Sequence, residues 1–76
     1  MTPDERKISD LSLASWLALQ GHALLRIEAN GRDRGYFVFH DTPDIERDSM
    51  SFYSRKALVE PIAYAEQMRM LRGAVR

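Results

Sequence analysis

The chain has 76 residues and a mass of 8.8 kDa, with 11 basic and 11 acidic side chains and 45% hydrophobic residues. This length allows one small globular domain and no second one. A domain of this size buries only about 60% of the surface that its unfolded chain exposes, so self-association or docking on a partner is an expected source of extra stability.

The sequence contains no cysteine, which excludes a disulfide framework and thiolate metal sites. The longest apolar run, residues 11–19, is interrupted by two serines and is far shorter than the ~20 residues of a membrane-spanning helix. Acidic and basic residues are mixed ahead of this run, unlike the start of a signal peptide. We therefore expect a cytoplasmic protein that does not enter a membrane.

The chain begins with a polar segment and a short helix. Residues 1–8 show no hydrophobic period, which predicts a flexible leader ahead of a single domain over residues 9–76. Asp10 or Ser12 can cap a helix at about 12–20, and Gly21 stands where a left-handed residue would end it. The apolar positions that define this helix are Leu13, Ala14, Leu17 and Ala18.

A β-hairpin follows, because residues 23–29 alternate with a period of two and residues 36–40 form a second strand after a turn-rich stretch. Asn30-Gly31 favours a two-residue turn, but that register would turn both Phe rings toward the polar face of the first strand. A loop of three or five residues avoids this. We prefer the five-residue loop, which pairs Ile27 with Phe37 and Leu25 with Phe39.

Two further helices are predicted, since Thr42 and Glu60 each precede a proline, a typical helix start. The first should run over about 43–54 and the second should end near Gly73. Residues 55–59 between them are either an extended link or a short strand. The expected order is α-β-β-α-α in an α+β domain, with the hairpin packed on helices. A short third strand at either the first or the last junction is a further alternative.

The stretches ISDLSLASWLALQGHALLRIE, GYFVFHD and LVEPIAYAEQMRMLR resemble a family of short bacterial and phage proteins known only as a domain of unknown function. The resemblance spans roughly residues 8–72 and is carried by hydrophobic patterns and turn residues. It implies a complete small protein of phages or mobile elements. It implies no reaction, and it transfers no catalytic residue to this chain.

The strand predicted over residues 36–40 is rich in aromatic residues and suggests two functions, base stacking and protein docking. Compared with the RNA-recognition signature that presents rings to bases, it lacks one residue between Tyr36 and Phe37, so we interpret Phe37 and Phe39 as core. The opposite sheet face would then expose an apolar patch suited to docking, unless the first helix or the leader covers it. The predicted protein-interface residues are Leu24, Tyr36, Val38, His40 and Trp16, with His22, Arg26 and Glu28 at the rim.

The sequence gives few indications of a metal site or a catalytic site. In the preferred register His22 and His40 lie diagonally on one sheet face near Asp41 and Asp44, an arrangement that could begin a zinc site. Nothing fixes a third ligand, so solvent-facing histidines are the better interpretation, and we predict neither metal nor cofactor. The chain has no cysteine nucleophile, no G-x-S-x-G, no Walker loop and no H-E-x-x-H, which favours a protein that is not an enzyme.

The charge is unevenly distributed, because residues 1–48 carry 6 basic and 9 acidic groups whereas residues 49–76 carry 5 and 2. The last helix should present basic residues on one face, which either complement the helix dipole or grip phosphates. The predicted nucleic-acid set is Arg55, Lys56, Arg69, Arg72 and Arg76, with Arg32 and Arg34 at the hairpin tip.

We therefore expect a non-catalytic interaction protein of accessory or inhibitor type that binds another protein or itself. The alternative is a weak nucleic-acid-binding accessory, although a pI near 6.7 is far from the basic character of such proteins.

Overall fold

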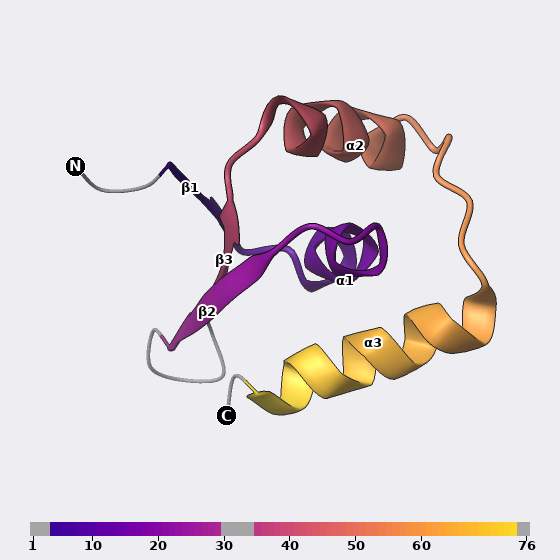
Figure 1. Cartoon of the computed structure of the whole chain (residues 1–76). Helices are drawn as coiled ribbons and strands as arrows, with labels where there is room; N and C mark the ends of the chain where they lie inside the picture. Colours follow the sequence, from indigo (N-terminus) through magenta and orange to yellow (C-terminus); the bar gives the residue numbers. More distant parts are fainter. Residues whose placement is uncertain (1–3, 30–34, 75–76) are drawn as a thin grey trace.

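The computed structural model describes residues 4–29 and 35–74. An antiparallel sheet with the strand order β1-β3-β2 packs against a central helix, which lies between the two others (Figure 1). The α+β class is confirmed, with the order β-α-β-β-α-α. The elements are β1 (Glu5–Ile8), α1 (Leu11–Leu19), β2 (Leu24–Ala29), β3 (Gly35–His40), α2 (Pro43–Tyr53) and α3 (Pro61–Ala74).

Helix α1 is the centre of the molecule, and its sequence explains why. An Asp10 carboxylate oxygen accepts a hydrogen bond from the Ser12 N–H at 2.9 Å and caps the start. Gly21, with φ of 91°, ends the helix in a Schellman motif. The helix is apolar on all sides, and every residue from Leu13 to Leu17 is buried, as expected for a helix enclosed by other elements.

The hairpin register confirms the predicted five-residue connection, because Ile27 pairs with Phe37 and Ala29 with Gly35. Residues 30–34 themselves lie outside the described residues. The expected pairing of Leu25 with Phe39 is wrong: a β-bulge lies between Leu24 and Arg26, so that Leu24 is opposite Phe39 and Leu25 becomes the extra residue. The bulge shifts the alternation by one residue and leaves Leu25 44% exposed.

The prediction of a flexible leader over residues 1–8 is wrong for Glu5–Ile8, which form strand β1 and pair antiparallel with β3. Ile8 lies opposite Phe37 and is buried in the core. Three successive charged residues hide the strand pattern in the sequence, because only one of four side chains enters the core. Of the two places considered for a third strand, the first junction is therefore the correct one.

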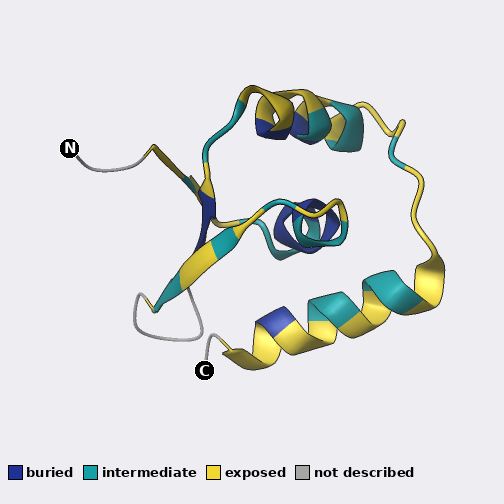
Figure 2. Cartoon of the chain, viewed as in Figure 1, coloured by how far each residue is buried: buried dark blue, intermediate teal, exposed yellow. Residues whose placement is uncertain are grey.

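Helices α2 and α3 begin at the predicted prolines. Thr42 Oγ1 accepts a hydrogen bond from the Ile45 N–H at 3.3 Å, and the Glu60 carboxylate accepts one from the Ala63 N–H at 2.6 Å. Phe37 and Phe39 are buried, as predicted. The shape is flat, 31 × 30 × 18 Å, and α3 is exposed along much of its length (Figure 2).

Candidate interaction surfaces

The outer sheet face, turned away from α1, is held together by ion pairs. Arg26 donates to both carboxylate oxygens of Glu5, at 2.7 and 2.8 Å, and its Nε donates to Glu28 at 2.8 Å. Lys7 lies 3.1 Å from Glu28, and its ammonium stands 5.7 Å from the centre of the Tyr36 ring. Three strands are thus bridged by one network of charges.

These contacts favour the ionised carboxylates. The hydrogen bond from Arg26 lowers the pKa of Glu5, and the hydrogen bonds from Lys7 and then Arg26 lower the pKa of Glu28. The same contacts raise the pKa of Arg26. The outer sheet face therefore stays charged at neutral pH, with its positive and negative groups paired.

This network overturns the predicted apolar patch. Val38 is 0% exposed although the helices of residues 4–29 and 35–74 all lie on the other side of the sheet (Figure 1). Lys7 and Arg26 flank it directly on the neighbouring strands, and their aliphatic stems can cover it. Tyr36 and His40 are exposed. The prediction of Val38 as an exposed interface residue is therefore wrong.

The other two predicted interface residues belong to the interior. Leu24 packs against the core because the bulge turns it inward. Trp16 is buried, its ring lies 6.5 Å from that of Phe52, and its Nε1 donates to the backbone carbonyl of Asp48 at 3.3 Å. Trp16 is off the Leu13–Leu17 face, but α1 is covered on more sides than one.

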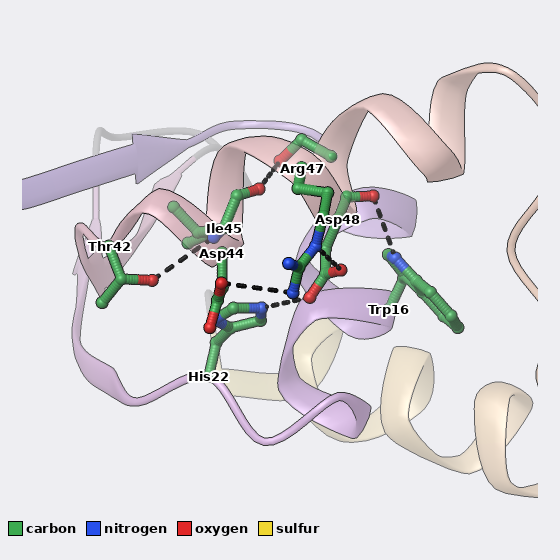
Figure 3. A network of polar contacts seen from close by, with 8 residues as sticks. Trp16, His22, Thr42, Asp44, Ile45, Arg47 and Asp48 are labelled. Atoms are coloured by element: carbon green, nitrogen blue, oxygen red, sulfur yellow. Dashed lines mark hydrogen bonds and ion pairs between the residues drawn. The ribbon is translucent and has the colours of Figure 1, made fainter.

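A polar network joins α2 to the start of β2 (Figure 3). His22 Nε2 lies 2.6 Å from Asp48 Oδ2, and the His22 side chain is only 10% exposed. Arg47 lies 3.2 Å from Asp44 and 3.9 Å from the second Asp48 oxygen. Asp48 thus anchors α2 with its carboxylate to His22 and with its carbonyl to Trp16, which is a structural role.

The diagonal pairing of two histidines on one sheet face is wrong. His22 turns to α2, whereas His40 lies on the outer sheet face opposite Glu5. Within the described part of the chain, no group of three or more His, Cys, Asp or Glu side chains is placed to hold a metal ion.

Most of the large exposed apolar side chains lie between the end of α2 and the start of α3, and the others are Leu25 on β2, Tyr36 on β3 and Met70 on α3. The former group, the apolar strip, has exposed fractions from 39% to 88% and comprises Met50, Tyr53, Leu58, Val59 and Ile62. The chain segment that carries these residues, from the end of α2 to the start of α3, runs along the edge of the molecule opposite the sheet (Figure 1). The sequence signal was the pair Leu58-Val59, which stands in a link without periodic partners.

A groove of about 390 Å³ lies between the β1–α1 junction and α2, beside the strip. Met50 and Tyr53 line one wall, and Tyr53 Oη donates to an Asp10 carboxylate oxygen at 3.1 Å. Burial and then this hydrogen bond raise the pKa of the Tyr53 phenol. The groove is wide enough for a side chain and has both apolar and polar walls.

Two basic residues, Arg55 and Lys56, precede Leu58 with only Ala57 between them. Helix α2 ends in a Schellman motif, with Arg55 N–H donating to Phe52 O at 3.1 Å and Lys56 N–H to Ser51 O at 2.9 Å. Arg55 occupies the left-handed position with φ of 64°, where glycine is usual. Both side chains are exposed, and neither forms an ion pair with any described residue.

The predicted nucleic-acid set is divided. Arg69 and Arg72 are exposed on the C-terminal half of α3, whereas Arg55 and Lys56 precede its other end (Figure 1). Arg76, like Arg32 and Arg34, lies outside the described residues.

These features define a small α+β domain in which an apolar helix is enclosed by a three-stranded antiparallel sheet and two further helices. The chain belongs to the family described as Domain of unknown function (DUF5659), whose model matches residues 4–76. This confirms the expected membership of a domain-of-unknown-function family. No curated protein and no solved structure matches the chain.

Across residues 4–29 and 35–74, no helix is both long and apolar enough to span a bilayer.

Proposed function

We propose that this protein acts by binding another protein and carries out no reaction of its own. The observation that carries the proposal is the apolar strip, in which Leu58 is 88% exposed. A series of large apolar side chains left in water is typical of a surface that a partner covers. The thin core offers these side chains no place inside the domain.

The outer sheet face is a poorer docking site than the strip, because its charges already satisfy one another and its central Val38 is covered. A partner would have to break ion pairs there without gaining apolar contact. The proposal that the protein is not an enzyme rests on the sequence, which lacks a cysteine nucleophile and the usual hydrolase, nucleotide-binding and metalloprotease motifs.

For the setting, we propose a cytoplasmic accessory or inhibitor-type protein of a phage or mobile element. The absence of cysteine suits a reducing compartment. The resemblance to short phage and bacterial proteins supports the mobile-element origin.

A second candidate function is weak nucleic-acid binding through the exposed arginines of α3. The supporting observation is that Arg69 and Arg72 form no ion pair with any residue that the structure describes. Binding of labelled single- and double-stranded DNA should then weaken steeply with salt and disappear when both arginines are changed to glutamate. No shift at low salt would exclude this function.

The docking proposal is tested by capture from a bacterial lysate followed by affinity measurement with the purified captured protein. Changing Leu58 and Ile62 together to glutamine should weaken binding by about tenfold or more, or about 1.4 kcal/mol. The matched control is Leu25→Gln, an exposed leucine on β2, which should leave the affinity unchanged. Equal binding by the strip variant and the wild type would contradict the proposal.

A further inference from the structure

Resting on the proposed function, we infer that the apolar strip binds a segment of another protein in which carboxylates flank apolar side chains. The inference follows from the position of Arg55 and Lys56. Leu58 follows Lys56 by two residues, a span of at most about 7 Å along the chain. A partner that covers Leu58 therefore comes within reach of both cations.

The charges of the molecule decide what that partner must carry. On the sheet and α2, each basic side chain already has an acidic partner, the four being Arg6, Lys7, Arg26 and Arg47. Around the strip and along α3 the situation is reversed, because the basic side chains of the described residues form no ion pairs; these are Arg55, Lys56, Arg69 and Arg72. Over residues 49–74 these four basic side chains stand against two acidic ones, Glu60 and Glu66, so the neutral total charge conceals a side with a net charge of +2.

Covering these cations with an apolar surface would remove them from water without a counter-charge, which is costly. Carboxylates on the partner would pair with them and also speed the encounter. The backbone of Arg55 is held in place, since two backbone hydrogen bonds of the Schellman motif define the turn that carries it. Its left-handed backbone would be more stable as glycine, which is consistent with a use for the arginine side chain.

Other occupants fit less well. A second copy docking strip to strip would offer the two cations Arg55 and Lys56 only one carboxylate, Glu60, so each half of the interface would keep an excess positive charge. Nucleic acid would pair with the cations but would give the strip's aliphatic side chains little to contact. Glu60 is exposed within the strip and would repel a uniformly anionic lipid surface, whereas a peptide segment can place its carboxylates beside Arg55 and Lys56 and away from Glu60.

The narrowness of the strip favours a segment over a broad surface. A standard protein interface uses about 20–30 residues on each side, whereas the strip is one stretch of chain from the last turn of α2 to the first turn of α3. The groove beside Met50 and Tyr53 adds a place for one side chain of the segment.

The test is selection of random dodecapeptides displayed on phage, with three immobilised baits. The baits are the wild type, the charge variant R55Q/K56Q and the apolar variant L58Q/I62Q. Wild-type protein should enrich peptides that combine Asp or Glu with Leu, Phe, Ile or Trp. The best peptide, synthesised with a fluorescent label, should bind the charge variant at least about tenfold more weakly, and its binding should weaken from low to high salt.

The outcomes separate the inference from the proposed function. Enriched peptides without an acidic bias, or equal affinity for the charge variant, overturn the inference while docking through the strip stands. No enrichment, or equal affinity for the apolar variant, overturns both. Binding to single-stranded DNA and to phosphatidylglycerol vesicles is measured as well, and light scattering gives the oligomeric state. Binding of DNA or vesicles, or dimerisation, that is present in the wild type and lost in L58Q/I62Q also overturns the inference. Circular dichroism confirms that each variant is folded.

Discussion

Replacing Val38 by threonine should destabilise the protein, even though no helix covers the sheet face on which Val38 lies. The side chain is 0% exposed between Lys7 and Arg26 on the adjacent strands. Threonine keeps the shape and the strand propensity but places a hydroxyl where a methyl group was. Moving a hydroxyl out of water without a partner costs about 1–3 kcal/mol in proteins. We therefore expect the free energy of unfolding to fall by about that amount.

Thermal denaturation followed by circular dichroism measures this effect. A loss of 1 kcal/mol lowers Tm by roughly 4–8 °C in a domain of this size, so the Val38→Thr midpoint should fall by at least roughly 4 °C. The control is Leu25→Thr at the bulge, where the side chain is 44% exposed and the change should stay within about 0.5 kcal/mol. A Val38→Thr midpoint equal to the wild type would refute the idea that ion-paired side chains seal this face.

Three further predictions concern the pH dependence of stability, the helix ends and the contact of His22 with Asp48. The two glutamates paired with Arg26 have lowered pKa values when folded, so they stabilise the fold above the unfolded Glu pKa of about 4.3 and lose this effect as the pH falls through their folded pKa. Tm should therefore drop more on acidification in the wild type than in Arg26→Gln; equal slopes would argue against the network. In urea titrations, Arg55→Gly should raise the free energy of unfolding by about 0.5–1 kcal/mol, because glycine adopts the left-handed backbone more easily than arginine. Gly21→Ala should lower it by about 1–2 kcal/mol for the converse reason. A destabilised Arg55→Gly variant would contradict this. His22→Ala should cost about 1–3 kcal/mol in the same titrations, since it leaves the Asp48 carboxylate without its closest partner, and a change within about 0.5 kcal/mol would show that water replaces the imidazole.

The helix ends and the hairpin register were predictable because single residues determine them. Gly21 is suited to the left-handed position after α1, and Thr42 and Glu60 each precede a proline at a helix start. The Phe37 and Phe39 pair had to face the core, which selected the five-residue connection. In each case the chemistry that decides the structure is local.

Three other features depend on contacts that are distant in sequence. Strand β1 forms because Ile8 reaches Phe37 and its backbone pairs with β3, which a four-residue charged segment does not reveal. The bulge at Leu25 has no glycine or proline to indicate it. Because the bulge changes which face each β2 residue occupies, and because Val38 is buried between Lys7 and Arg26, the sequence did not reveal that Leu24 and Val38 are covered.

Hydrogen–deuterium exchange, read by mass spectrometry with and without the captured partner or the selected peptide, tests the docking site most directly. We predict slower exchange in fragments covering residues 50–62 and unchanged exchange in strands β1, β2 and β3. Slower exchange on the strands, with residues 50–62 unchanged, would contradict docking through the apolar strip.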